Sequence, residues 1–327
     1  MSKRLLIVDG DLVAYRHAAA AESRTIIAKH LDSGREKEFK TRTELKKFLK
    51  DKGMEFKTED YAITDLQHPL DISFALSTVD QAIAKLQEVT WCDDVEIYIG
   101  SGKTFRHALA LPTPYKDNRA DNIRPVHLAA VRSHLRRKYK AKVVDNGLEV
   151  DDVVTIRAYE CLQNAQEAVL ASVDKDSYQC QGIALYNWLA ADPKIELIPD
   201  VGHLRKDKDT VKGDGLMFLA FQVLAGDAAD CYKGYELSKV KYGPTKAMNA
   251  LKDCTTEQEI LKVVISEFKR LYPEAFEYTD CHSVKHDEAD WFDMLNLYWQ
   301  CAYMKRSWDD PSSFMNYAMQ RGVNPYE

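Results

Sequence analysis

Acidic residues follow the apolar, strand-like runs of this sequence at three separate places. In chain order the three sets are Asp9 with Asp11, Glu149 with Asp151 and Asp152, and Asp174 with Asp176. The runs that precede them are "RLLIV", "AKVV" and "AVLASV". In an open parallel sheet, ligands bind at the carboxyl ends of the strands. We therefore expect the three sets of carboxylates to meet at one edge of a sheet.

Crowded carboxylates repel one another unless cations lie between them. A further pair, Asp227 and Asp230, lies in "GDAAD", which we expect to be helical with both acids on one face. Any single pair has a simpler explanation, because Asp is common after strands and acids complement the dipole of a first helical turn. Taken together, these acids offer only oxygen ligands, without His or Cys, and such a set favours Mg²⁺ or Mn²⁺. Two such ions about 4 Å apart stabilise the attacking and leaving oxygens of phosphodiester hydrolysis.

The segment "GSGKTF" at residues 100–105 offers a competing reading as a phosphate-binding loop. A Walker A loop needs a glycine five residues before its Gly-Lys pair. That position is Ile97, in the middle of a strand-like run. The pattern fails, and a turn after a strand is the better interpretation.

Composition limits the class of protein. The 327 residues are 45% hydrophobic and 29% charged, which is typical of globular proteins. No apolar run reaches the length of a membrane span, so we expect no membrane partner. The seven cysteines include no Cys-x-x-Cys pair, which predicts free thiols and a cytoplasmic location. The net charge of −6 argues only weakly against binding nucleic acid, since its distribution matters more than its sum.

The order of elements predicts an α/β fold. Apolar runs at 4–8, 95–99, 141–144, 168–173 and 195–199 read as buried strands, and helical patterns lie between them. This alternation predicts a parallel sheet flanked by helices. Residues 23–70 interrupt it with a hairpin turning at Asp32-Ser33-Gly34 and a charged helix, "RTELKKFLKD". After about residue 210 we expect helices without further strands.

With these features in place, the chain resembles the 5′-nuclease superfamily of flap endonucleases and 5′→3′ exonucleases on a PIN-like sheet. It is most similar to the phage-encoded members of the phage T7 gene 6 exonuclease type. The motifs that carry the resemblance are "LLIVDGD", "YKDNR", "LEVDDV", "VDKD" and "GDAAD", in the family's order. It implies a nuclease domain at 1–205, with an insertion at 23–70 and a helical arch at 100–138. It also implies a helical DNA-binding region at 206–327.

The resemblance assigns roles to the acids by position. Asp9, Glu149, Asp151, Asp174 and Asp176 would surround the metals. Asp152, Asp227 and Asp230 would hold a second ion or its waters. Asp11 would contribute through the same face of the chain as Asp9.

The motif "YKDNR" gains its meaning from the same resemblance. Tyr115 resembles an aromatic residue that stacks on a base, while Lys116 and Arg119 resemble the basic pair that grips the scissile phosphate at the foot of the arch. Arg16 would contact the same phosphate. At the end of the preceding strand, where the family usually has an aspartate, this sequence has Gly100 and Ser101. This departure predicts weaker metal binding.

Two further segments relate to DNA. The basic run "RSHLRRKYKAK" at 132–142 is either a solvated helix face or a set of phosphate contacts. The segment "GDAADCYKGYELSKVKYGPTKAMNAL" resembles the helix–three-turn–helix that holds duplex DNA in the family, often with a bound K⁺. The usual glycine-rich turn is degraded here to "GYELSKVKYGP". The tail "WFDMLNLYWQCAYM" is expected to pack as core.

The leading hypothesis is a metal-dependent 5′→3′ exonuclease that acts on duplex DNA ends and leaves 5′-phosphates. We also expect flap-endonuclease activity and RNase H activity on RNA–DNA hybrids. We expect the protein to be a monomer in a bacterial host cytoplasm, with replication proteins as partners. One alternative is a PIN-type ribonuclease without arch or DNA clamp. The other is a noncatalytic, structure-specific DNA-binding protein with a decayed site.

Overall fold

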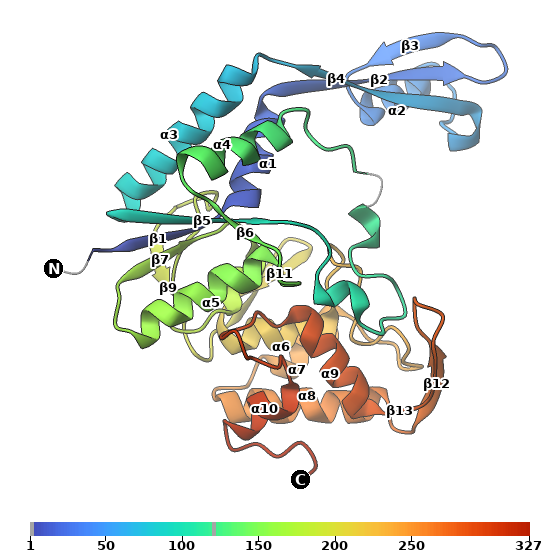
Figure 1. Ribbon diagram of the computed structural model, residues 1–327. Coiled ribbons are helices and arrows are strands. Elements are labelled where there is room, and N and C mark those ends of the chain that lie inside the picture. Colours follow the sequence, from blue (N-terminus) through green and yellow to red (C-terminus); the bar gives the residue numbers. More distant parts are fainter. Residues whose placement is uncertain (1–2, 120–121) are drawn as a thin grey trace. The chain divides into compact units, whose positions relative to one another are not determined.

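The computed structural model describes residues 3–119 and 122–327 (Figure 1). Contacts divide the chain into two compact units. The first comprises Met1–Gly10, Lys85–Asn122 and Tyr139–Glu327, and the second comprises Asp11–Ala84 and Ile123–Lys138. The units do not follow the boundary expected at residue 205, because the strands and the C-terminal helices fall within one unit. The division into a nuclease domain and a DNA-binding region stays a prediction.

The first unit contains a six-stranded sheet in the order β6-β5-β1-β7-β8-β9. The strands are β1 (Leu5–Asp9), β5 (Asp94–Gly100), β6 (Lys142–Val144), β7 (Ala168–Ala171), β8 (Ala184–Tyr186) and β9 (Ile195–Leu197). All neighbours are parallel except β8 and β9. The predicted α/β class with a parallel sheet flanked by helices is confirmed.

The sheet differs from the sequence-based expectation at one edge. The strand β8 was not predicted, because its three residues "ALY" are too few to show a period. The run at 195–199 forms the edge strand β9, which pairs antiparallel with β8 instead of extending the parallel sheet. At the other edge (β6) and in the centre (β5, β1 and β7), the strands form at the predicted apolar runs.

Helix α5 (Val150–Gln163) packs on β1, β5 and β7. Most of its residues are buried, including Val153, Val154 and Ile156, so it covers the centre of the sheet. Its first turn is fixed by a capping box between Glu149 and Asp152, in which each side chain accepts from the backbone N–H of the other. Helix packing and capping together hold the start of α5, where the acids lie.

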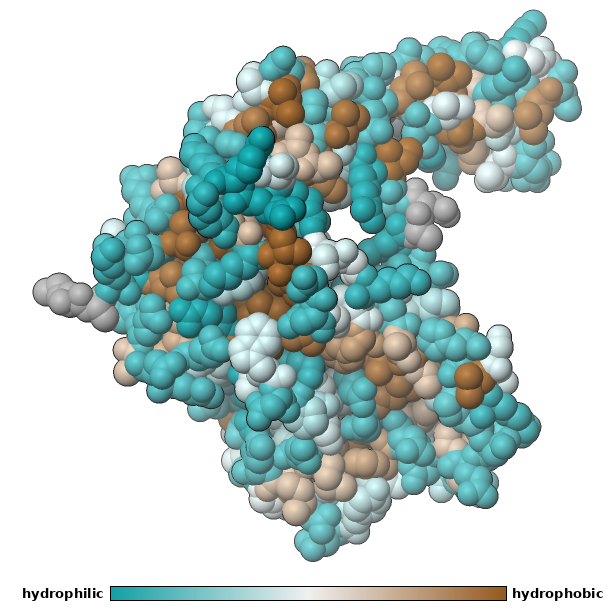
Figure 2. Space-filling model, in the orientation of Figure 1, coloured by the Kyte–Doolittle hydropathy of each residue, from teal (hydrophilic) through white to brown (hydrophobic). Residues whose placement is uncertain are grey.

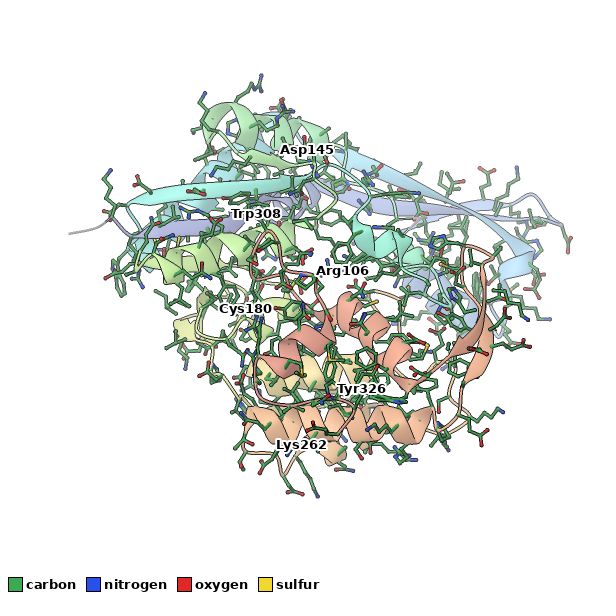
Figure 3. The ribbon with its side chains drawn as sticks, turned by 60° about the horizontal axis from the view of Figure 1, so that its bottom comes forward. Arg106, Asp145, Cys180, Lys262, Trp308 and Tyr326 are labelled. Atoms are coloured by element: carbon green, nitrogen blue, oxygen red, sulfur yellow. The ribbon has the colours of Figure 1, made fainter. Side chains whose placement is uncertain are left out.

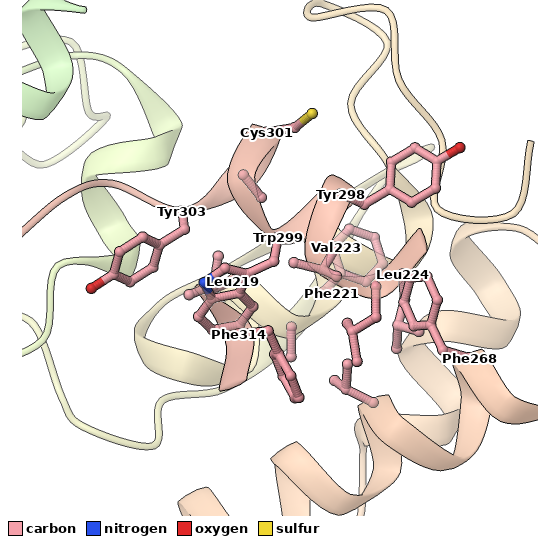
Figure 4. Close-up of a cluster of buried hydrophobic side chains, with 14 of the residues drawn as sticks. Leu219, Phe221, Val223, Leu224, Phe268, Tyr298, Trp299, Cys301, Tyr303 and Phe314 are labelled. Atoms are coloured by element: carbon pink, nitrogen blue, oxygen red, sulfur yellow. The ribbon is translucent and has the colours of Figure 1, made fainter. Parts of the chain in front are cut away.

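The C-terminal half of the first unit is built around α6, all of whose residues are buried. The helices are α6 (Gly215–Ala225), α7 (Pro244–Leu251), α8 (Glu257–Leu271), α9 (Trp291–Ala302) and α10 (Phe314–Met319). Phe268, Tyr298, Trp299 and Phe314 pack with residues of α6 (Figure 4). Because Tyr298 and Trp299 have no exposed surface, the expectation that the tail packs as core is confirmed.

The expectation that strands stop near residue 210 is wrong. Two hairpins lie in the second half of the chain: β10 (Leu204–Asp207) with β11 (Thr210–Gly213), and β12 (Phe276–Thr279) with β13 (Lys285–Ala289). These strands are short, charged and partly exposed, as in "KHDEA", so they show no apolar alternation. Their pairing depends on the partner strand more than on the local pattern.

The helical reading of "GDAAD" is also wrong. Helix α6 ends at Gly226, whose φ of 78° lies in the left-handed region that favours glycine. Asp227 then forms a β-bridge with Tyr232. A Cβ at Gly226 would lie 2.2 Å from the carbonyl oxygen of Tyr232, so this turn requires glycine. Asp227 and Asp230 therefore come from a turn between α6 and α7, and the helix–three-turn–helix stays a prediction.

The second unit is built around a three-stranded antiparallel sheet in the order β3-β2-β4. Its strands are β2 (Glu22–His30), β3 (Glu36–Phe39) and β4 (Tyr61–Pro69), with the short 3-10 turn η1 (Thr58–Asp60) before β4. Helix α2 (Arg42–Asp51) covers the sheet with Leu45 and Leu49. The predicted hairpin and charged helix are confirmed, with Gly34 at a φ of 65° in the turn.

The helices α1 (Gly10–Ala20), α3 (Ile72–Thr90) and α4 (Leu128–Lys138) lie wholly or mostly in this second unit. Part of the basic run is ion-paired here, since Arg132 bonds to Asp11 at 2.8 Å and Lys138 to Asp80 at 2.7 Å. Of the region expected to form an arch, 100–138, residues 120 and 121 lie outside the described residues. The rest forms η2 (Phe105–Ala108), η3 (Asp117–Arg119) and α4, and the arch stays a prediction. Across the described ranges, every helix is too short or too polar to span a bilayer.

Candidate active site

The parallel strands of the first unit bring acids to one edge of the sheet. Asp9 is the last residue of β1, which lies between β5 and β7 with all three strands parallel. Asp174 follows β7 after a short connection, and Glu149 precedes α5 after β6. Asp9 and Glu149 are buried, with 3% and 9% of their surface exposed. Asp9, Glu149 and Asp174, one member of each predicted set, therefore lie near Asp151 at this edge, whereas Asp11 does not belong to the group.

A first acidic group consists of Asp9, Glu149, Asp151 and Asp174. Burial raises the pKa of Asp151 well above its usual range, and the charges of Asp174, Asp9 and Glu149 raise it further. The Oδ1 atom of Asp151 is buried and has no hydrogen-bond partner in the described part of the chain. A buried carboxylate oxygen without a donor is costly unless a cation supplies the missing interaction.

A second acidic group consists of Asp176, Asp227 and Asp230. One oxygen of each lies within 4.8 Å of the others. Burial, together with the charge of the neighbouring Asp174, raises the pKa of Asp176 to about 8. Asp176 also accepts a hydrogen bond from Gln222 of α6. The spacing and the oxygen-only chemistry of the three side chains suit a hard divalent cation.

Cations occupy part of the space between the acids. The Lys116 Nζ atom lies 2.7 Å from Glu149 Oε1 and 3.9 Å from Asp230 Oδ1. Arg119 bonds to Asp230 at 2.9 Å. Lys175 bonds to Asp227 at 2.5 Å. Burial alone would lower the pKa of Lys116, but Glu149 and Asp230 outweigh it and raise the pKa, so Lys116 is charged.

A fourth cation, Arg106 of η2, is completely buried and bonds to Asp152 through two nitrogens at 2.6 and 2.9 Å. Its remaining donors bond to the carbonyl oxygens of Cys301, in the last turn of α9, and of Tyr303, just after the helix, and to Glu149 at 3.4 Å. Figure 3 shows Arg106 in the interior, beside the C-terminal helices. Arg106 therefore ties the start of α5 to the C-terminal segment.

The charges of the site do not balance. The site contains eight carboxylates and four cations: Asp9, Glu149, Asp151, Asp152, Asp174, Asp176, Asp227 and Asp230 against Arg106, Lys116, Arg119 and Lys175. Metal ligands must be deprotonated, and with all eight carboxylates ionised, eight minus four leaves four negative charges, which equals the charge of two divalent cations. The residues present therefore fit a pair of metal ions, by their donor atoms, by their net charge and by the partnerless oxygen of Asp151.

Two expected roles are revised by this geometry. Both oxygens of Asp152 face Arg106, and they also accept from the backbone N–H groups of Glu149 and Lys305, so Asp152 has no free lone pair directed to a metal. Tyr115 is 5% exposed, so its ring has no free face on which a base could stack. Its hydroxyl instead donates to Asp230 at 2.8 Å and lies 3.2 Å from Glu149.

Other expected residues lie elsewhere. Asp11 and Arg16 belong to the second unit, where Asp11 pairs with Arg132 and Arg16 is exposed. Ser101, at the place where the family has an aspartate, donates from its hydroxyl to the carbonyl oxygen of Val144 at 2.7 Å. The roles expected for Asp11, Arg16, Lys116 and Arg119 toward metal and phosphate stay predictions.

Arg106, Gln222 and Lys175 are site residues to which no sequence pattern assigned a role. Lys175 stands between two predicted ligands in "VDKD", which is a signal that could have been used. Arg106 and Gln222 carry no such signal, because each is a single polar residue in an apolar or turn segment. Only the fold reveals that they reach buried acids.

No model of a protein family and no curated protein matches this chain. Among solved structures, the T5 5′-exonuclease with bound zinc aligns with 81% of this chain and 85% of its own, with 15% identity and a TM-score of 0.47. The bacteriophage T5 flap endonuclease in a complex with DNA and metal ions aligns with 80% of this chain and 78% of its own, with 14% identity and a TM-score of 0.45.

Proposed function

We propose that this chain is a metal-dependent 5′→3′ exonuclease that hydrolyses phosphodiesters at the ends of duplex DNA and leaves 5′-phosphates. The observation that carries the proposal is the convergence of two acidic groups with four uncompensated negative charges at the carboxyl edge of a parallel sheet. The 5′→3′ polarity and the DNA substrate are what the resemblance to the 5′-nuclease superfamily implies, which the five sequence motifs carry. Flap cleavage, RNase H activity and a part in phage DNA replication are finer expectations of the same proposal.

The residues divide into two ligand groups. Asp9, Glu149, Asp151 and Asp174 would hold one ion, and Asp176, Asp227 and Asp230 would hold the other, with Mg²⁺ or Mn²⁺ as the metal that suits oxygen ligands. Such a pair of ions, when bound, supplies Lewis-acid stabilisation of the attacking and leaving oxygens. We assign Asp152 to the positioning of Arg106 rather than to either group.

Lys116 and Arg119 act on the substrate in this proposal. Both bond to acids of the site, so their charged groups already lie beside the carboxylates that would hold metal. A phosphate that enters between them would exchange these carboxylate contacts for contacts with its own oxygens. A fixed cation beside the scissile phosphate stabilises negative charge that grows in the transition state. The buried hydroxyl of Tyr115 bonds to both Glu149 and Asp230 and so fixes the position of one acid relative to the other.

The proposal is tested with a 5′-labelled duplex, a flap substrate and an RNA–DNA hybrid, each incubated with Mg²⁺, with Mn²⁺ or with EDTA. We expect metal-dependent release of nucleotides from the 5′ end of the duplex and none in EDTA. Cleavage of single-stranded RNA in preference to every DNA substrate would favour a PIN-type ribonuclease instead. Binding without cleavage under all metal conditions would favour a noncatalytic DNA-binding protein.

A further inference from the structure

The exposed surface of helix α2 in the second unit is rich in lysine. Residues 37–57 contain eight Lys and Arg against four Asp and Glu, in a chain whose net charge is −6. We call Lys37, Lys46, Lys47, Lys50 and Lys52 the α2 lysine surface; all five are exposed. Leu45 and Leu49 face the sheet, and Lys46, Lys47 and Lys50 lie on the exposed side of the helix, which also carries Glu44 and Asp51. This distribution concentrates positive charge on one element.

These lysines lack acidic partners. In the described ranges, no carboxylate oxygen lies within 4.0 Å of the Nζ atom of any residue of the α2 lysine surface. Other cations of the same unit are paired, as Arg42 is with Asp65 at 2.6 Å and Lys29 with Glu36 at 3.2 Å. Acids are thus available nearby but do not neutralise this surface. Like charges held together without partners form a ready site for a polyanion.

Aromatic rings lie between the lysines. The ammonium groups of Lys37 and Lys52 lie 3.8 and 5.3 Å from the centre of the Phe48 ring, and Lys46 lies 5.3 Å from that of Phe56. Both rings are only partly buried. Figure 2 shows apolar surface among hydrophilic surface over this region, which Figure 1 labels as β2, β3 and α2. Cations interleaved with accessible rings are typical of surfaces that bind single-stranded nucleic acid.

A hollow lies beside one flank of the helix. It has a volume of about 530 Å³ and is lined by Lys46, Lys50, Gly53, Met54, Glu55 and Phe56. Met54 is 47% exposed, which gives the hollow an apolar wall next to two cations. An unstacked base has an apolar face and carries a phosphate on its backbone, so this combination suits it.

A purely structural role explains only part of this surface. Lysines near a helix C-terminus complement the helix dipole, which accounts for Lys50 and Lys52. It does not account for Lys37, which lies on β3, or for Lys46, which lies in the middle of the helix. The surface therefore carries more unpaired charge than the helix requires.

We infer that the α2 lysine surface binds single-stranded DNA through its phosphates, independently of sequence, as a second contact site outside the acidic centre. Only the choice of DNA as the polyanion rests on the proposed function. A flexible strand can follow the curved surface of one helix and place bases against Phe48, Phe56 and Met54. A rigid duplex can present fewer phosphates to so short an element.

The test measures binding without cleavage. A full-length variant combining Lys46→Gln, Lys47→Gln and Lys50→Gln is titrated onto a fluorescent oligothymidine in EDTA over a series of salt concentrations. Each phosphate contact to a single strand contributes about 0.7 to the slope of log affinity against log salt. We expect binding weakened about tenfold at low salt and a slope smaller by about 2.

Controls separate local contacts from net charge and folding. The combination of Lys85→Ala, Lys194→Ala and Lys262→Ala removes the same charge from elements outside the surface and should leave binding unchanged. The triple Lys→Arg variant at 46, 47 and 50 keeps the charge and should bind like the wild type. Equal losses in both charge-removing variants, or a loss confined to duplex DNA, would overturn the inference. Because EDTA prevents turnover, these results stand whether or not the chain proves to be a nuclease.

Discussion

Arg106 and Asp152 face each other with two hydrogen bonds of 2.6 and 2.9 Å, and neither side chain has any exposed surface. A buried ion pair adds little net stability, but removal of one partner leaves an uncompensated charge. Arg106 also holds the carbonyl oxygens of Cys301 and Tyr303. The pair therefore couples the helix that carries the acids to the C-terminal segment.

We expect Arg106→Met to lower the free energy of unfolding by roughly 3–5 kcal/mol, since it leaves Asp152 buried and charged. Urea denaturation in EDTA measures this without a contribution from metal. Arg42→Met is the matched control, because Arg42 makes a similarly short pair with Asp65 on the surface. Exposed pairs contribute about 0–1 kcal/mol. Comparable losses in the two variants would contradict the structural role assigned to Arg106.

The sequence predicts the sheet and its acids better than it predicts their partners. Apolar runs such as "RLLIV" and the acids after them are local patterns, so β1, β5, β7 and Asp9 could be inferred directly. The bond between Arg106 and Asp152 joins residues 46 positions apart, and no local pattern encodes it. "GDAAD" was misread for a different reason: Gly226 is a local signal for a helix end, and its left-handed backbone and the bridge from Asp227 to Tyr232 end the helix before these acids.

Asp151→Asn should abolish cleavage while DNA binding remains close to normal, because Asp151 is assigned to metal rather than to phosphate. The same substitution should raise the thermal stability of the metal-free protein, since Asn needs neither to bury a charge among other carboxylates nor to take up a proton on folding. Single-turnover assays and thermal melts in EDTA measure the two effects. Asp94→Asn, in an exposed residue at the start of β5, is the control. Near-normal turnover of Asp151→Asn in Mg²⁺ would count against the two-metal assignment.

Lys116→Ala should slow the chemical step about 100-fold or more, because a fixed cation beside the scissile phosphate lowers the activation free energy by about 3 kcal/mol or more. The backbone at Lys116 has a φ of 57°, so Lys116→Asn, which tolerates this conformation, separates loss of charge from strain. Single-turnover rates at saturating enzyme exclude an effect on binding. If both variants cleave at the wild-type rate, "YKDNR" is an ordinary loop.

The stability of the first unit should fall in acid through Glu96. Burial alone would raise the pKa of this carboxyl, but bonds from Arg157, Lys142 and Tyr98 outweigh it and lower the pKa to about 2. A lowered folded-state pKa means that the stabilisation is present above about pH 4.5 and is lost as the pH falls toward 2. We expect Glu96→Gln to cost up to about 3 kcal/mol at pH 7 and progressively less below pH 4. A cost that does not change between pH 7 and pH 3 would contradict the ion-pair explanation.

Ser101→Asp tests the place where this sequence departs from the family. Ser101 follows the end of β5, and its hydroxyl bonds to the carbonyl oxygen of Val144 rather than to an acid of the site. If a carboxylate at this position would hold metal through water, its absence should make metal binding weak, so the cleavage rate should depend steeply on Mg²⁺ concentration. The substitution should then lower the Mg²⁺ concentration needed for half-maximal rate, whereas Ser101→Asn, of equal size and no charge, should not. Mn²⁺ should reduce the difference between wild type and variant, because it binds a given oxygen site more tightly than Mg²⁺. Identical metal titrations for Ser101→Asp and Ser101→Asn would show that residue 101 does not take the place of the family's aspartate.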